Sequence, residues 1–206
     1  MPFYSMSDQE KLFVRRVGEG EPVLVLSGLG MQSWQWLPFL FANRKQYEFI
    51  IPDWRGFGGS KNCAIPELDA ISSHWNDVDS LIQQLKLDQF ILMGYSMGAT
   101  TAMHGMKHGG LAEKLKAYLH IDQTPKIAVD DSWQYGLFGP KHPQFKNLLL
   151  EIQTLLLDYK HAQKLEDLPD DIRYKLVSLW GDFIELQGSN NYSPKIFKLA
   201  LNRPFL

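Results

Sequence analysis

The chain has 206 residues, of which 45% are hydrophobic and 21% are charged, and its formal net charge is −2. These values are ordinary for a globular protein, and the near-neutral charge gives no reason to expect nucleic acid or an anionic membrane as a partner. The single cysteine, Cys63, cannot form a disulfide within the chain, which favours a reducing compartment. The first ten residues contain no apolar run and no stretch approaches about 20 apolar residues, so neither a signal peptide nor a membrane span is predicted. We therefore expect a cytoplasmic α/β protein.

The first fifty residues alternate between strand and helix patterns. An antiparallel pair is expected around a polar turn at residues 7–9, and a break at Gly18-Glu19-Gly20 precedes a continuously apolar strand. Such runs, apolar on both faces, are typical of central parallel strands that helices cover. A helix interrupted by Pro38 and a second apolar strand follow. The predicted segments are strands at 2–6, 11–17, 22–26 and 49–51 and a helix over 34–46.

The middle of the chain repeats this alternation after a glycine-rich loop. An amphipathic helix is predicted from about Ala70 to Leu85, because its apolar residues recur at helical spacing. A strand at 90–93, a helix from Ser96 to about His108 and a strand at 117–121 follow. The alternation predicts an α/β fold with a mostly parallel sheet flanked by helices.

After Asp122 only helical periodicity is evident. Helices are predicted at 144–160, 170–180 and 194–201. The chain is thus expected to consist of a core over residues 1–125 and a helical cap over residues 126–206. A stripe of leucines in the first of these helices can line a substrate pocket, but ordinary packing explains it more simply.

The motif Gly94-Tyr95-Ser96-Met97-Gly98 directly follows an apolar strand and precedes a helix. A serine in this setting, with glycine two residues to either side, is the sequence form of a nucleophile elbow. The turn is expected to hold Ser96 in a strained backbone conformation with its hydroxyl exposed. Side chains at positions 94 and 98 would collide with neighbouring chain, which explains both glycines.

Three motifs in this order resemble those of the α/β-hydrolase superfamily. Ser27-Gly28-Leu29-Gly30 follows one strand, residues 53–60 (DWRGFGGS) follow the next, and the serine motif comes after both. The likeness, which includes Ile121-Asp122-Gln123-Thr124-Pro125, is to the cap-bearing esterases and cofactor-free haloperoxidase-like proteins. This resemblance implies an α/β-hydrolase fold over residues 1–125. In addition, no glycine-rich loop of the sequence has the spacing of a phosphate-binding site. Neither a metal nor another cofactor is therefore expected.

The resemblance implies a role for each matching residue of the site. Ser96 would be the nucleophile that attacks a small carboxylic ester or thioester and forms an acyl-enzyme. The N–H groups of Met97 and Leu29 would stabilise the oxyanion, with Gly28 shaping the turn that presents Leu29. The expected partner is accordingly a small-molecule ester.

Two further positions are interpreted structurally. Ser27 stands where the family usually has histidine, an exchange that leaves catalysis possible because the loop acts through backbone N–H groups. The loop after Asp53 is expected to be structural, with Asp53 and Arg55 paired so as to hold the oxyanion loop.

The remainder of a catalytic triad is not recognisable. In the family the acid follows the seventh strand and the histidine follows the eighth, and neither strand is evident before Leu206, so the C-terminal strands of the core are expected to be absent. Asp122, after the sixth strand, can supply the acid, although a hinge between core and cap is a simpler role. The alternative to a serine hydrolase is therefore a catalytically silent relative that binds a ligand or partner in the same pocket.

None of the six histidines is a convincing base. His104 and His108 lie ~12 and ~18 Å down the helix axis from Ser96, too far for proton transfer. Of the other four, His120 is assigned to the core and His74 to a solvated surface. His142 and His161 are assigned to the cap.

Without further strands, residues 117–121 become an edge of the sheet. An apolar edge is a template for pairing with another chain. We expect such a chain to be less stable or more prone to associate than a complete hydrolase, and a homo-oligomer can form through this edge.

Overall fold

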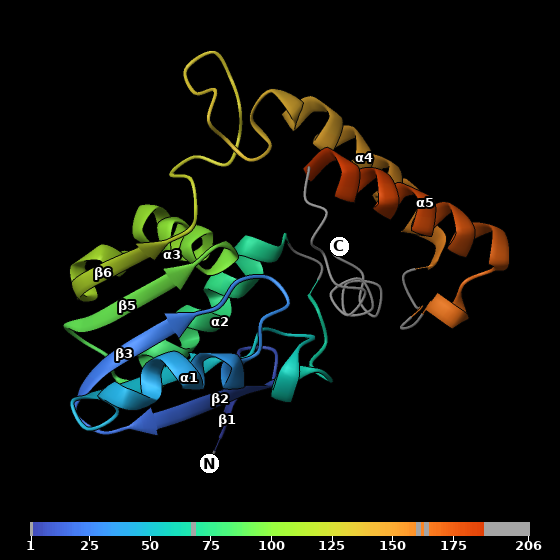
Figure 1. Cartoon of the computed structure of the whole chain (residues 1–206). Helices are drawn as coiled ribbons and strands as arrows, with labels where there is room; N and C mark the ends of the chain where they lie inside the picture. The colour runs from blue at the N-terminus through green and yellow to red at the C-terminus, as the bar shows by residue number, and fades with distance from the viewer. Residues whose placement is uncertain (1, 67–68, 160–161, 163–164, 188–206) are drawn as a thin grey trace. The chain divides into compact units, whose positions relative to one another are not determined.

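The computed structural model describes residues 2–66, 69–159, 162 and 165–187, and the helix predicted at 194–201 lies outside them. The chain divides into two compact units, one reaching Gln123 and the other starting at Thr124. The first contains a sheet with helices on both faces, and the second is helical (Figure 1). The two are described separately below.

The strands described in the first unit form one sheet in the order β1-β2-β4-β3-β5-β6. β3, β4, β5 and β6 run parallel, whereas β2 is antiparallel to both β1 and β4. This arrangement confirms the predicted α/β class with a mostly parallel sheet. The strands are β1 (Phe3–Ser5), β2 (Lys11–Gly18), β3 (Glu21–Leu26), β4 (Tyr47–Pro52), β5 (Phe90–Tyr95) and β6 (Leu115–Ile121).

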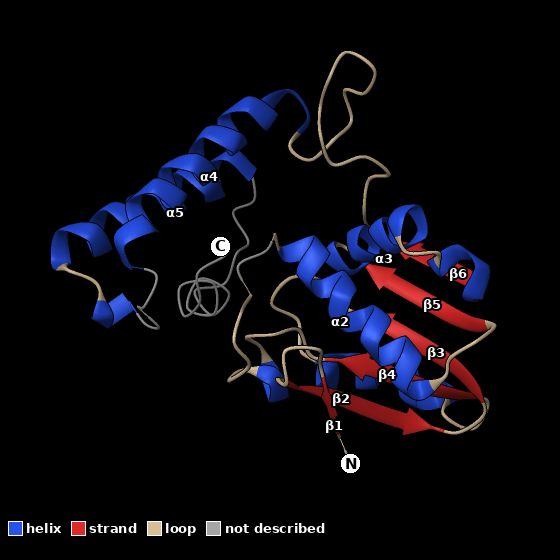
Figure 2. Ribbon diagram, turned by 180° about the vertical axis from the view of Figure 1, so that it is seen from behind, coloured by secondary structure: helices blue, strands red, loops and turns tan. Residues whose placement is uncertain are grey.

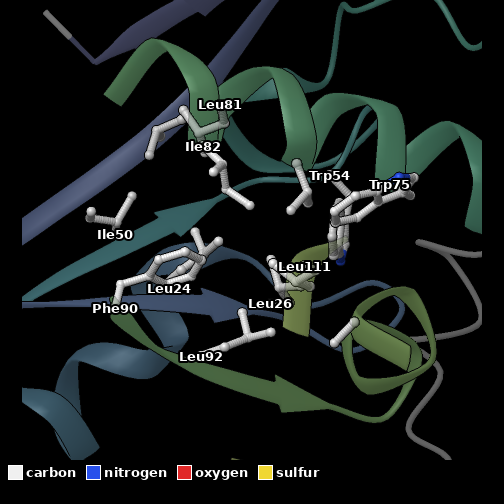
Figure 3. Close-up of a cluster of buried hydrophobic side chains, with 13 residues drawn as sticks. Leu24, Leu26, Ile50, Trp54, Trp75, Leu81, Ile82, Phe90, Leu92 and Leu111 are labelled. Carbon is white, nitrogen blue, oxygen red and sulfur yellow. The ribbon is translucent and has the colours of Figure 1, made fainter. Parts of the chain in front are cut away.

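Two helices, α2 (Ala70–Leu85) and α3 (Met97–His108), cover one face of the sheet (Figure 2). α2 begins where predicted because the Asp69 carboxylate accepts a hydrogen bond from the Ser72 N–H at 2.9 Å. It ends where Lys86 adopts a left-handed conformation. Apolar side chains of the two layers meet in the main core, shown in Figure 3: Leu24, Leu26, Ile50, Leu81, Ile82, Phe90 and Leu92.

The opposite face carries a chain of short helical turns instead of the single helix predicted at 34–46. These turns are η1 (Ser33–Trp36), α1 (Leu37–Leu40) and η2 (Phe41–Asn43). Pro38 stands in the first turn of α1, where its missing N–H is tolerated, so no continuous hydrogen-bond ladder crosses it. A second core cluster lies here: Val23, Val25, Trp36, Leu40, Phe49 and Ile51.

The second unit contains two packed helices, α4 (His142–Leu156) and α5 (Asp170–Gln187). An aromatic cluster joins them, with the rings of Phe145 and Phe183 5.9 Å apart. The helix predicted at 144–160 ends its α-helical part at Leu156. The remaining short turns in the described parts of the chain are η3 (Gly58–Ser60), η4 (Leu111–Lys114), η5 (Gly139–Lys141), η6 (Leu157–Tyr159) and η7 (Leu165–Asp167).

Candidate active site

Ser96 occupies a strained turn between β5 and α3. Its φ is +50° and its ψ is −119°, a conformation that non-glycine residues rarely adopt. Surrounding backbone holds it there: the Ser96 N–H donates to the Ile121 carbonyl at 3.0 Å, and the Ser96 carbonyl accepts from the Ala99 N–H at 2.9 Å. The side chain does not cap the helix, and within the described residues no hydrogen bond engages its hydroxyl. The hydroxyl is therefore available to a ligand.

The two glycines of the motif allow α3 to lie close against the strands. A Cβ atom on Gly94 would lie 2.8 Å from the Ala99 Cα, and one on Gly98 would lie 2.1 Å from the Leu26 carbonyl oxygen. Both contacts are with backbone, which cannot swing away. The prediction that side chains are excluded at both positions is confirmed.

The turn after β3 lies directly beside Ser96. A Cβ on Gly28 would come within 2.9 Å of the Tyr95 ring and 3.4 Å of the Ser96 Cβ. Leu29 follows with 48% of its surface exposed. In the described part of the chain, the N–H groups of Leu29 and Met97 donate no hydrogen bond. The structure thus brings the Gly28 turn together with Ser96 and leaves two donors uncommitted.

Asp53 fixes the far end of this turn. Its buried carboxylate accepts from the Ser33 N–H at 2.5 Å and from the Gly59 N–H at 2.8 Å. The expected pairing of Asp53 with Arg55 is wrong, because Arg55 binds Asp77 and Asp8 instead. Asp53 does hold the loop, as expected, but through backbone. Sequence reasoning missed Ser33 because a backbone donor has no side-chain signature.

Asp122 lies at the same end of the sheet as Ser96. It follows Ile121, whose carbonyl accepts a hydrogen bond from the Ser96 N–H. Asp122 is exposed and has a φ of +51°. No hydrogen bond to its carboxylate is present among the residues described. Its backbone therefore lies beside the serine turn while its side chain remains unengaged.

Two histidines lie in surroundings that differ from those predicted. His74 is inside α2 and only 8% exposed, stacked on Trp54 with ring centroids 4.3 Å apart, because the apolar face of α2 that meets the sheet includes this position. Burial, with the nearby Arg55 charge, lowers the pKa of His74 to about 4. His120 is exposed instead of packed in the core, because among the described strands β6 pairs with β5 alone. Its Nε2 donates to the Gln123 carbonyl at 2.6 Å, and its Nδ1 lies 2.9 Å from the Tyr118 hydroxyl.

Three further histidines make local contacts within their own units. The rings of His104 and His108 contact each other, with centroids 4.8 Å apart. The His142 Nδ1 lies 2.8 Å from the Leu137 carbonyl, and His161 is outside the described residues. Over the described ranges, no hydrogen bond joins a histidine to Ser96.

A search of the described residues finds no group of three or more side chains arranged to bind a metal ion. Their helices also lack the length and apolar character needed to cross a membrane.

A mostly parallel sheet that presents a strained serine between strand and helix is the framework of a hydrolase core. The family model described as the alpha/beta hydrolase fold matches residues 21–142, more than half of the chain. The chain belongs to this family.

Individual relatives match part of the chain. Epoxide hydrolase 2 of Siraitia grosvenorii is 33% identical over 96 residues, which are 45% of this chain and 30% of that protein. Pimeloyl-[acyl-carrier protein] methyl ester esterase of Legionella pneumophila is 28% identical over 119 residues, 57% of this chain and 44% of the esterase. The chain thus spans less than half the length of these curated relatives.

Solved structures share the fold. An esterase from Exiguobacterium antarcticum aligns with a TM-score of 0.60 at 22% identity, covering 86% of this chain and 66% of its own. This likeness establishes the architecture alone.

Proposed function

We propose that the protein is a serine hydrolase that cleaves small carboxylic esters or thioesters through an acyl-enzyme on Ser96. The observation that carries the proposal is the strained conformation of Ser96 between β5 and α3, with its hydroxyl uncommitted. This turn is interpreted as a nucleophile elbow. A positive φ at a non-glycine residue costs of order 1–3 kcal/mol and commonly persists where function requires it.

The chemistry proceeds in two steps. The Ser96 oxygen attacks the carbonyl carbon while its proton passes to a base, and the alcohol or thiol leaves as the acyl-enzyme forms. Water then adds to the acyl carbon, and the carboxylic acid leaves as Ser96 regains its proton. In both steps the oxyanion accepts hydrogen bonds from the N–H groups of Leu29 and Met97. Gly28 shapes the turn that presents the Leu29 N–H. The N-terminal end of α3 adds a favourable dipole.

An ester as substrate is favoured by one relative in particular. The pimeloyl-[acyl-carrier protein] methyl ester esterase, by its name, acts on a methyl ester. Because the chain spans only part of that protein, the activity of this chain is a proposal of its own. Asp122, whose backbone lies beside the serine turn, is proposed as the acid of the triad.

A catalytically silent, ligand-binding relative is the second candidate. It is favoured by the absence, over the described ranges, of any hydrogen bond between Ser96 and a histidine. The cap role of residues 126–206, a homo-oligomer and a cytoplasmic location also stay predictions.

Labelling with a fluorophosphonate probe separates the two candidates. This reagent forms a covalent bond only with an activated serine, so the purified chain should be labelled and Ser96→Ala should not. The labelled peptide is then identified by mass spectrometry. A folded sample that stays unlabelled would instead identify the chain as a silent relative, and equal labelling of the two proteins would show that another residue reacts.

A further inference from the structure

Two indole groups hold Ser27, the residue directly before the Gly28 turn. Trp36 donates its Nε1–H to the Ser27 hydroxyl oxygen at 3.0 Å, and Trp54 donates its Nε1–H to the Ser27 carbonyl at 2.8 Å. Ser27 and Trp54 are fully buried, and Trp36 is 8% exposed. Loss of one partner of such a buried hydrogen bond is costly, because water cannot replace it. The start of the turn is therefore held by both its side chain and its backbone.

Trp36 also contacts the strand that leads to Ser96. Its ring packs edge-on against Tyr95, with centroids 6.1 Å apart and an interplanar angle of 82°. Tyr95 precedes Ser96, and its ring lies close against Gly28. A Cβ atom on Gly28 would lie 2.9 Å from the Tyr95 ring. One side chain thus touches both segments whose separation determines where Leu29 lies relative to Ser96.

We propose that Trp36 is a positioning residue for the acyl transfer: by holding the Ser27 hydroxyl and packing against Tyr95, it fixes the Leu29 N–H relative to the Ser96 oxygen. This inference rests on the proposed function. It also explains how a serine can stand at position 27, since the indole N–H supplies the polar partner that the hydroxyl needs when buried. Trp36 does not touch the reacting atoms and acts through Ser27 and Tyr95.

The test is the kinetics of fluorophosphonate labelling in Trp36→Phe. Phenylalanine retains an aromatic ring facing Tyr95 but cannot donate to Ser27. Because a small displacement of an oxyanion donor weakens transition-state stabilisation, we expect the maximal labelling rate to fall about tenfold while the probe concentration at half-maximal rate stays unchanged. Ser27→Ala removes the acceptor and should lower the same rate to a similar extent, so it replaces Trp36→Phe if that variant does not fold.

Trp75→Phe is the matched control. Trp75 is also 8% exposed, but it packs on Gly105 and Gly109 in the main core and, within the described residues, makes no hydrogen bond to Ser27. Its substitution should lower the melting temperature without changing the labelling rate. If Trp36→Phe and Ser27→Ala label as fast as the unmodified chain, or if Trp75→Phe is slowed equally, the positioning role is wrong.

A second readout separates failure of this inference from failure of the proposed function. The Met31 N–H donates across the turn to the Gly28 carbonyl at 3.2 Å, so its hydrogen exchange reports on the turn without any reaction. Exchange should accelerate at least tenfold in Trp36→Phe and stay unchanged in Trp75→Phe. An unlabelled native chain with this exchange pattern would refute the hydrolase while retaining the positioning of the turn. Unchanged exchange in Trp36→Phe would refute the positioning itself.

Discussion

Ser96 and His74 are both held in states that are unfavourable in isolation. Ser96 has a positive φ, and the buried His74 Nδ1 has no hydrogen-bond partner among the described residues. The contacts that compensate are different. Backbone hydrogen bonds hold Ser96 in place, whereas His74 is sandwiched into the core by its stacking on Trp54. A neutral imidazole is the form that this apolar setting accepts.

The His74 environment predicts a loss of stability in acid. Its pKa is about 4 in the folded protein, mainly because of burial, against an ordinary value of 6.5. As the pH falls below 6.5, the unfolded chain binds a proton at this position and the folded chain does not, so the free energy of unfolding decreases until about pH 4. The shift corresponds to roughly 3 kcal/mol. Urea unfolding at pH 7.5 and pH 4.5 measures the decrease.

His74→Phe is the comparison for this prediction. Phenylalanine can stack on Trp54 but cannot be protonated, so the variant should lose roughly 2.5 kcal/mol less between the two pH values than the unmodified chain. Acidic residues contribute equally to both proteins and cancel in the difference. The same loss in both proteins would show that the imidazole is not responsible.

Among the helices and strands, those with a clear apolar period were predicted best. Residues 70–85 form α2 as predicted, because one apolar face and the Asp69 cap act together. The helix expected over 34–46 is broken into short turns, because its pattern is interrupted at Pro38. His120 was misplaced for a different reason: the exposure of a strand residue depends on which strands pair beside it, and this is a long-range property.

In the candidate site, too, the features encoded by a local motif were predicted and those that depend on long-range contacts were not. Its serine and glycines follow from a local motif that encodes a strand, a tight turn and a helix. The contacts that hold the neighbouring turn join segments far apart in sequence, such as Asp53 with Ser33 and Trp36 with Ser27. Neither pair has a spacing that a sequence pattern reveals.

A partly buried ion-pair network links three elements of the first unit. The Arg55 side chain, 5% exposed, binds Asp77 of α2 at 2.7 Å and Asp8 of the β1–β2 turn at 2.5 Å. It also donates to the Ala64 carbonyl at 2.9 Å. Since Asp77 is buried as well, the guanidinium has no water to replace a lost partner there.

Asp77→Asn should therefore destabilise the fold by about 3 kcal/mol, because it leaves a buried charge without its main partner. Glu48→Gln is the control, since it breaks the Arg16–Glu48 pair, in which Arg16 is 44% exposed. Exposed pairs contribute at most about 1 kcal/mol. Chemical unfolding of both variants at pH 7.5 gives the two values, and a loss below 1 kcal/mol for Asp77→Asn would show that Asp8 alone satisfies Arg55.

The two edge strands of the sheet differ in length. β1 is a short strand of three residues, whereas β6 has seven and, within the described residues, pairs only with β5. Ala117 and Leu119 on β6 are exposed, the latter by 44%, and the register places them beside Ile91 and Met93 of β5. The β6 edge of the sheet thus combines unpaired backbone groups with an apolar face, a combination that favours strand pairing between chains.

Leu119→Lys tests whether this edge causes association. A charged side chain on an edge strand opposes pairing with a second strand, so the variant should shift toward monomer while the unmodified chain self-associates as its concentration rises. Leu149→Lys makes the same exchange at a residue of α4 that is 41% exposed and outside any strand, and should leave association unchanged. Sedimentation velocity over a hundredfold range of concentration distinguishes the three proteins. If the unmodified chain is monomeric throughout, pairing at β6 is too weak to matter; if both variants reduce association equally, general hydrophobicity and not the strand edge is the cause.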